Sequence, residues 1–228
     1  MAPLALLVAL LLPAAPVVSL LVPMDSPAIV YSPYNWAVNA SRAKTIYAGA
    51  YFRVIFSGQS CVLHTDTFQA GGWTGLHGPV YSHFYTRVDG GALQGPHVTV
   101  PGSPSFNVSL GPIFSSSPNH LLEVIVKATS ETVNRWTPQD SAVIITGIEL
   151  GDGATVVAPR RKPFNVLIFG DSITEGVRAL GYTGSWQRND TDRNDATRDY
   201  VHIYTPQPPF ACNFQCFWRD CLRFPELS

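Results

Sequence analysis

Ser172 is the side chain in this sequence best placed to do chemistry. It closes the turn 170–172, Gly-Asp-Ser, at the end of the continuous apolar run 164–170. Such a run is typical of a parallel strand buried on both faces, and ligands of open α/β sheets collect where such strands end. We expect a helix to begin here, so that the serine hydroxyl attacks an acyl carbon while its own N–H stabilises the oxyanion. Gly170 would allow a tight turn with no side chain to block the approach to Ser172.

A simpler interpretation of the same residues stays open. Ser172 and Glu175 have the spacing of a capping box, in which a serine only satisfies the first amides of a helix. Taken alone, residues 172–175 favour the capping-box interpretation. Only the longer string VLIFGDSITEG, with its strand, its glycine and its acidic residue, points to a nucleophile.

The rest of the chain predicts a mainly β protein. Short β-branched and aromatic runs, at 50–56, 121–127 and 142–149, alternate with glycine-rich turns, as in a sandwich or jelly roll. We place this β-sandwich at 25–157. A proline-bracketed polar connector ends it, and the incomplete start of an α/β domain follows at 163–228.

The string VLIFGDSITEG resembles the first block of the SGNH/GDSL hydrolases. Further strings, in the same order, are similar to carbohydrate esterase family 2: they lie at 32–36, 49–53, 120–124, 146–149 and 194–200. The resemblance covers roughly residues 30 to 200. It implies an N-terminal jelly roll joined to an SGNH domain that removes acetyl groups from polysaccharides.

Carried over residue by residue, the resemblance makes Ser172 the nucleophile and first oxyanion donor, with Asp171 and Gly170 ordering its turn. The family also needs a later glycine, an asparagine, and a histidine three residues after an aspartate; none is recognisable here. His202 has the D-x-x-H spacing, but it follows Ser172 too closely to be the family's base. We therefore expect a truncated chain that is weakly active or inactive; a fragment without a function of its own is a further alternative.

The implied reaction needs no cofactor and no metal, and its substrate is an acetylated polysaccharide or another acyl ester. An alternative function is a non-catalytic carbohydrate-binding sandwich, in which tryptophans stack on sugar rings or, more simply, pack in the core. The tryptophans in question are Trp36, Trp73 and Trp136. Net charge is −1 and the only basic run is 160–162, which argues against nucleic acid as a partner.

Residues 1–19 are almost entirely apolar and broken by prolines, as in a secretory signal peptide, with an uncleaved anchor as the alternative. No later stretch is long enough for stable membrane insertion. Three N-x-S/T sequons agree with a secreted, extracellular glycoprotein; their asparagines are Asn39, Asn107 and Asn189.

The cysteines and histidines do not identify a metal site. Four cysteines are present, three of them crowded after residue 211, and their spacing fixes no disulfide and no zinc site. The sandwich histidines are expected on the surface or in loops; they are His64, His77, His83, His97 and His120. The proline-rich tail 201–228 has no strand period, so we expect 163–228 to be poorly ordered or to dock on the sandwich.

Overall fold

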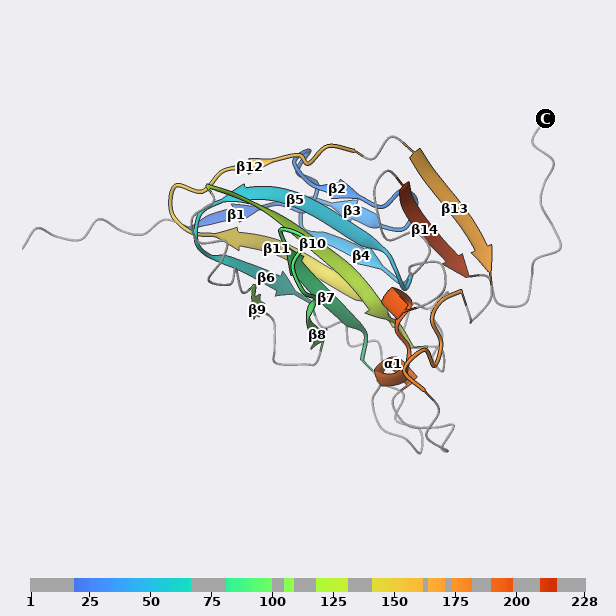
Figure 1. Cartoon of the computed structure of the whole chain (residues 1–228). Helices are drawn as coiled ribbons and strands as arrows, with labels where there is room; N and C mark the ends of the chain where they lie inside the picture. Colours follow the sequence, from blue (N-terminus) through green and yellow to red (C-terminus); the bar gives the residue numbers. More distant parts are fainter. Residues whose placement is uncertain are drawn as a thin grey trace, which may run out of the picture.

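The computed structural model describes residues 19–66, 81–99, 105–108, 118–130, 141–161, 164–170, 174–181, 190–198 and 210–216. Two antiparallel sheets and one parallel strand pair make up this part of the chain (Figure 1). The prediction of a mainly β protein with an N-terminal sandwich is confirmed.

The first sheet, called sheet A, has β11 at its centre. In spatial order its strands are β3 (Ala37–Asn39), β4 (Arg42–Thr45), β11 (Val143–Leu150), β6 (Cys61–Thr65) and β9 (Ser105–Asn107), with β1 (Leu20–Val22) also paired to β11. The first strand, β1, pairs Leu20 with Leu150 and Val22 with Ile148. The start of the described chain is thereby joined to the last long strand of the sandwich.

The second sheet, called sheet B, is built around β5 and β10. In spatial order its strands are β12 (Val156–Val157), β5 (Tyr51–Ser57), β10 (Asn119–Ala128), β7 (His83–Val88) and β8 (Gln94–Val98), with β2 (Val30–Tyr31) also paired to β5. The predicted runs at 50–56, 121–127 and 142–149 correspond to β5, β10 and β11, because β-branched and aromatic side chains suit a pleated, half-buried surface.

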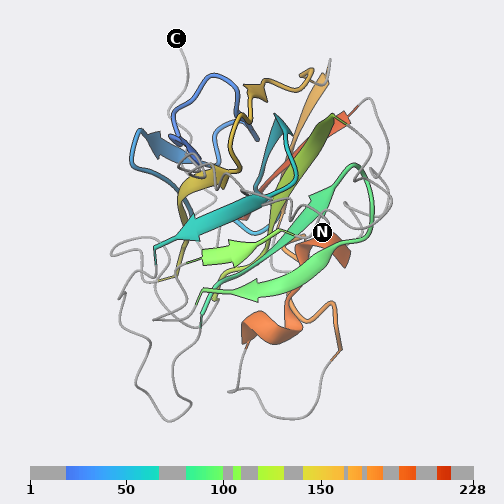
Figure 2. The same ribbon diagram turned by 90° about the vertical axis from the view of Figure 1, so that its left-hand side faces the viewer.

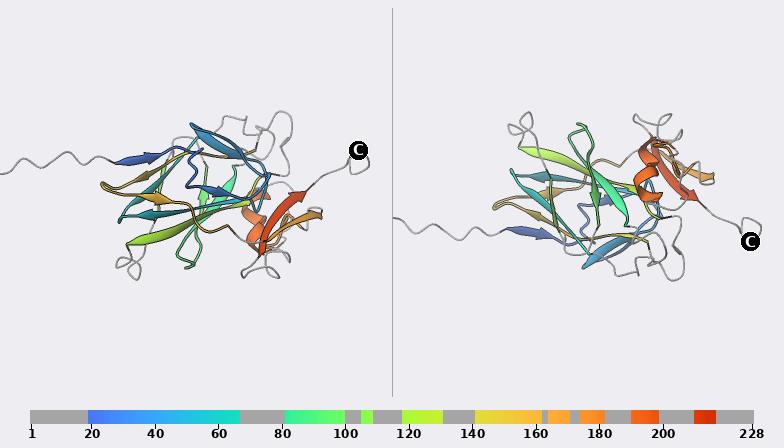
Figure 3. Two further views of the ribbon diagram at one scale, coloured as in Figure 1. Left: turned by 90° about the horizontal axis from the view of Figure 1, so that it is seen from above. Right: turned by 90° about the horizontal axis from the view of Figure 1, so that it is seen from below.

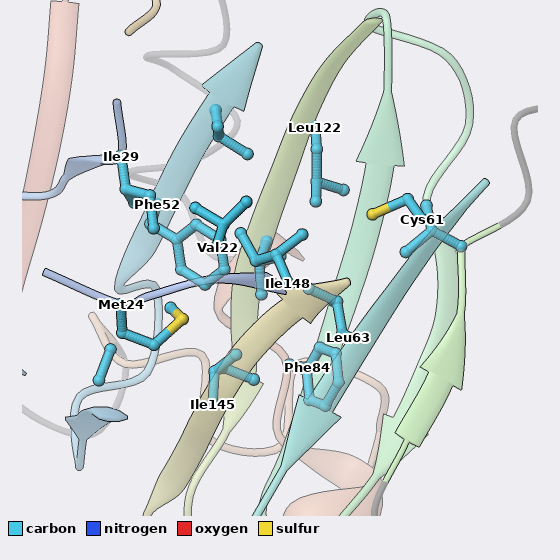
Figure 4. Packing of buried hydrophobic residues seen from close by; sticks show 14 of the residues in the cluster. Val22, Met24, Ile29, Phe52, Cys61, Leu63, Phe84, Leu122, Ile145 and Ile148 are labelled. Atoms are coloured by element: carbon cyan, nitrogen blue, oxygen red, sulfur yellow. The ribbon is translucent and has the colours of Figure 1, made fainter. Parts of the chain in front are cut away.

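The core lies between the two sheets and is made by the alternation within each strand (Figure 4). In β5, Phe52 and Phe56 are fully buried, whereas Tyr51 and Ile55 on the opposite face are half-buried. Successive side chains of a strand point to opposite faces, so each strand gives every second residue to the core. Sheet A meets them with residues such as Leu63.

The third pair of strands follows the connector. Strand β13 (Phe164–Gly170) runs parallel to β14 (Phe210–Cys216), from Phe164 opposite Phe210 to Gly170 opposite Cys216. The strand prediction for the apolar run before Ser172 is confirmed. The prediction of a tail without strands is wrong, because 210–216 supplies the hydrogen-bonding partner that a lone β13 would lack.

The parallel pair and the helical turns lie at one end of the sandwich (Figure 3). Helix α1 (Asp190–Arg193) and the 3₁₀ turn η1 (Ala196–Arg198) lie next to β10. Figure 2 shows the same orange segment beside the green strands of sheet B. The expectation that part of 163–228 docks on the sandwich therefore holds for 190–198. Among the described residues, no helix has the length and apolar character needed to cross a membrane.

Candidate active site

The predicted nucleophile turn begins at the carboxyl end of β13. Gly170 is the last residue of that strand, and Asp171 and Ser172 lie outside the described residues. In open α/β sheets, ligands bind beyond the carboxyl ends of parallel strands, and β13 has a parallel partner in β14. Gly170 therefore ends a strand with a parallel partner, and the place of Asp171 and Ser172 stays a prediction.

The helix expected after Ser172 does not form in the residues that the structure describes. Residues 174–180 are turns, with a φ of 75° at Gly176 and of 60° at Arg178. Left-handed residues interrupt a right-handed helix, and a non-glycine residue there is uncommon. The helix prediction is therefore wrong for 174–180, and the capping-box interpretation of Ser172 and Glu175 loses the helix that it requires.

Gly176 brings two parts of the segment into contact. The Asp195 N–H donates to the Gly176 carbonyl at 2.9 Å. A Cβ on Gly176 would overlap the backbone carbonyl of Asp195, so only glycine fits. Further along, the Arg178 N–H donates to Asn194 Oδ1 at 2.8 Å and the Leu180 N–H to the Arg193 carbonyl at 3.1 Å. Residues 174–181 and 190–198 therefore form one unit, which we call the docked segment.

Lys127 holds the docked segment on the outer face of sheet B. It follows the core residue Val126 at an irregularity of β10, and it is only 1% exposed. Lys127 Nζ donates to the carbonyls of Thr191 at 2.5 Å and Asn194 at 2.6 Å, with the Asp192 carbonyl at 3.3 Å. Burial lowers the pKa of this ammonium, and the carboxylates of Asp195 and Asp192 oppose that effect.

Asp195 is the second buried charge at this junction, with 1% exposure. Its Oδ2 accepts from the Tyr85 hydroxyl of β7 at 2.9 Å. Its Oδ1 accepts from the Thr197 N–H at 2.9 Å and from the Thr197 hydroxyl at 2.6 Å. Burial, and then the neighbouring Asp195 carboxylate, raise the pKa of Tyr85. This carboxylate thus satisfies its own segment and a sandwich strand at once.

His83, also on the outer face of β7, completes the junction. It is 3% exposed, its Nε2 lies 3.6 Å from Asp192 Oδ1, and its Nδ1 has no partner. Burial, and then the Lys127 charge, lower the pKa of His83 to about 4, with Asp192 acting in the other direction. His83 is accordingly neutral near pH 7.

Two other sandwich histidines also have carboxylate partners. His120 is 1% exposed and its Nδ1 lies 2.8 Å from Asp89 Oδ2, while His64 on β6 pairs with Glu149 at 2.7 Å. The surface-or-loop prediction is wrong for His83 and His120, since both lie buried on strands. His97 lies on β8; His77 and His202 lie outside the described residues.

Sequence reasoning missed the junction residues. One signal was available: Lys127 is a cation in an otherwise apolar run, and a buried cation requires partners. A second was the string 194–200, which was related to the segment after the nucleophile but given no role. Neither signal shows that Lys127 and this string contact each other.

The remaining predicted residues are distributed over the sandwich. Asn39 on β3 and Asn107 on β9 are exposed, and Asn189 lies outside the described residues. Cys61 is buried and free on β6, and burial raises its thiol pKa to about 12. No three metal-ligating side chains gather anywhere in the described ranges. Trp36 is half-buried, and Trp73 and Trp136 fall in ranges that are not described.

Comparison with known proteins gives a structural match without a sequence match. No family model matches the sequence, and no curated protein matches it. A family two carbohydrate esterase from Cellvibrio japonicus superposes with a TM-score of 0.65 at 17% identity, over 88% of this chain and 52% of that one. An acetyl xylan esterase from the rumen bacterium Butyrivibrio proteoclasticus gives 0.59 at 10% identity, over 87% and 48%.

A third solved structure on the same fold carries out a different reaction. It is a salicylyl-acyltransferase from a tetracycline biosynthetic pathway, with a TM-score of 0.55 at 12% identity, over 88% of this chain and 53% of that one. The chain thus spans about half the length of the structures it matches. Over the matched part it has the fold of these carbohydrate esterase structures.

Proposed function

We propose that this chain carries the nucleophile of an SGNH-type serine ester hydrolase that acts on acylated carbohydrates, O-acetyl groups above all. The observation that carries the proposal is the position of the GDS turn: it follows the carboxyl end of β13, a strand with a parallel partner, in a chain with the fold of family two carbohydrate esterases. Fold alone does not decide function. The motif supplies the chemistry.

In the proposed reaction the Ser172 oxygen attacks the acyl carbon and its proton passes to a base. The tetrahedral oxyanion is stabilised by the Ser172 N–H, and its collapse expels the sugar oxygen, which takes up a proton. Water then attacks the acyl-enzyme and releases the carboxylic acid. This sequence requires no cofactor. The resemblance gives the base to a histidine, and no residue of this chain is assigned that role.

The junction on sheet B supports a positioning role for the sandwich. In the sequence, Asp171 and Ser172 come between β13 and the docked segment, and the docked segment is held by Lys127 and Tyr85. A nucleophile works only when its surroundings are held in place. We propose that the sandwich supplies this support. We also propose that the chain by itself hydrolyses esters slowly, because the later glycine, asparagine and histidine that the resemblance requires are not recognisable in it.

Ester hydrolysis by the purified chain tests the proposal. With p-nitrophenyl acetate and with acetylated xylan, we expect slow release of acetate that falls to background in Ser172→Ala. The Ser172-dependent excess over the uncatalysed rate should not exceed about 10³–10⁴-fold. Ser105→Ala, an exposed serine on β9, is the matched control and should change nothing. Equal rates for the wild type and Ser172→Ala would refute a role for this serine.

The alternative, a non-catalytic carbohydrate-binding sandwich, makes the opposite prediction. Glycan binding would then survive Ser172→Ala, and the wild type would hydrolyse no ester. Transfer of the acyl group to an acceptor other than water, as the acyltransferase on this fold implies, would appear as an acylated product in place of free acetate.

We also propose that residues 1–19 are a cleaved leader, that 25–157 and 163–228 are the sandwich and the partial hydrolase domain, and that the protein is secreted and glycosylated. The exposure of Asn39 and Asn107 is compatible with glycan attachment. Sequencing the amino terminus of the secreted protein tests the leader. Stepwise gain of mobility in Asn39→Gln, Asn107→Gln and Asn189→Gln tests the three sites.

A further inference from the structure

A pocket of about 200 Å³ opens on the sandwich, away from β13 in the sequence and outside the proposed ester chemistry. It lies where the turn before β3 meets the end of β4. Its lining combines aromatic, amide and apolar groups: Tyr34, Asn35, Trp36, Ala37, Lys44, Thr45, Ile46 and Tyr47. Pockets for drug-sized ligands measure about 300–1,000 Å³, so this one suits a single small ring.

Tyr34 stands at the mouth of this pocket in an unusual backbone conformation. Its φ is 64°, and its side chain is 84% exposed. A bulky residue in the left-handed region is strained, and strained residues gather at ligand clamps. Among the described residues, Tyr34 is the only aromatic among the exposed large hydrophobic side chains. The protein thus holds an aromatic face out to solvent beside the pocket.

Asn35 gives the pocket an amide without partners. The residue is 2% exposed, and neither its Nδ2 nor its Oδ1 makes a hydrogen bond. Buried amides are almost always satisfied, because leaving both halves unpaired is unfavourable. Asn35 is therefore the polar group of this pocket that is available to a ligand.

Trp36 also lines the pocket and is held rigidly. Its Nε1 donates to the Tyr51 carbonyl at 3.1 Å, and its ring lies 5.6 Å from that of Tyr31 and 5.7 Å from that of Phe52. Trp36 is therefore tied into the core. Of the two sequence interpretations of this tryptophan, packing is the one that the structure supports, and Tyr34 beside it provides the exposed aromatic face.

We propose that this pocket binds one pyranose unit of a neutral polysaccharide whose ring hydroxyls are equatorial. Such a ring presents a flat face of C–H groups to the Tyr34 ring and neighbouring hydroxyls to the Asn35 amide, which can donate and accept at once. Strand β3, at the edge of sheet A, has three residues and is too short to bind a peptide by strand addition.

Binding includes a movement of the turn that carries Tyr34 and Asn35. The two amide atoms of Asn35 are shielded from solvent, so a sugar hydroxyl reaches them only when this turn shifts. Such a shift would also allow Tyr34 to leave its strained φ. The pocket should therefore respond to a sugar with changes confined to the turn and to the facing end of β4.

Titration of the full chain with cellohexaose, whose ring hydroxyls are equatorial, tests this proposal by calorimetry and by amide chemical shifts. We expect saturable binding and shifts in residues 33–37 and 44–47. Tyr34→Ala should weaken binding about tenfold or more, whereas Tyr34→Phe should keep it. Asn35→Leu, of similar volume, should weaken binding while leaving the protein as stable or more stable, because it removes an unsatisfied amide. Leu93→Ala, another exposed apolar residue, is the control.

The outcome is separable from the fate of the esterase proposal. Ser172→Ala should bind cellohexaose as the wild type does. If binding is lost in Ser172→Ala and kept in Tyr34→Ala, the sugar binds at the nucleophile and the pocket proposal fails. No saturable binding by the wild type also overturns it, as does binding by Tyr34→Ala and by Asn35→Leu that is as tight as that of the wild type. Hydrolysis by Ser172 can succeed or fail in each of these cases.

Discussion

The two faces of sheet B are stabilised by different kinds of interaction. Its inner face meets sheet A with apolar side chains such as Phe52, Phe84 and Leu122, each fully buried. Its outer face, at the end near α1, buries Lys127 and Tyr85 against the docked segment. Apolar packing accepts many partners of the right size, whereas buried polar groups need particular atoms at particular distances. The inner face therefore accounts for the fold, and the outer face for the attachment of the candidate active site.

The largest effect is expected on the inner face. Phe52→Ala leaves a cavity in the core and should lower the free energy of unfolding by about 3–5 kcal/mol. Because the docked segment rests on this sheet, both regions should unfold together at the lower denaturant concentration. Val157→Ala, at a residue that is 56% exposed, is the control and should stay within about 0.5 kcal/mol.

Breaking the outer face should be nearly as costly but local. Lys127→Met keeps the length of the side chain and leaves the carbonyls of Thr191 and Asn194 buried without their donor. We expect the docked segment to lose about 3 kcal/mol of protection in hydrogen exchange, while the sandwich unfolds nearly as before. Arg42→Met, at an exposed cation on β4, is the matched control. Unchanged exchange in residues 190–198 would show that Lys127 does not hold the segment.

Acid should weaken the junction through His83. Its folded pKa of about 4 lies below the ordinary value of 6.5, so the unfolded chain binds the proton more readily. Stability is therefore fully present above pH 6.5 and declines as the pH falls towards 4, by about 2 kcal/mol between pH 7 and pH 5. Denaturant unfolding of the wild type and of His83→Phe over this range measures the difference. If the two curves run parallel, His83 is not buried in its neutral form.

The smallest effect is expected from one hydroxyl. Tyr85→Phe removes the donor to Asp195 Oδ2, which keeps its contacts within the docked segment on Oδ1. We expect a loss of about 1 kcal/mol in the unfolding free energy. Tyr34→Phe, at an exposed hydroxyl, should show no loss. A larger loss in Tyr34→Phe than in Tyr85→Phe would reverse the assignment.

The same contrast explains what the sequence predicts. Strands β5, β10, β11 and β13 follow from local runs of β-branched and aromatic residues, because each run carries its own pattern. Strand β14 was missed, since a parallel partner distant in sequence leaves no local signal. The helix expected after Ser172 was wrong because Arg178, a residue compatible with a helix, adopts a left-handed φ of 60°.

The candidate site divides in a similar way. The GDS turn after an apolar strand was predictable from a string of adjacent residues. The contacts of Lys127 with Thr191 and Asn194 join residues more than sixty positions apart, and the pocket beside Tyr34 depends on an amide whose lack of partners only a structure can show. Polar contacts of this kind leave no periodic pattern in the sequence.

Labelling of the intact protein with a fluorophosphonate, read by mass spectrometry and peptide mapping, tests the nucleophile assignment most directly. We predict a slow, single adduct on Ser172, absent from Ser172→Ala and unchanged in Ser105→Ala. An adduct on another serine, or the same labelling in wild type and Ser172→Ala, would contradict the assignment of residue 172 as the attacking group.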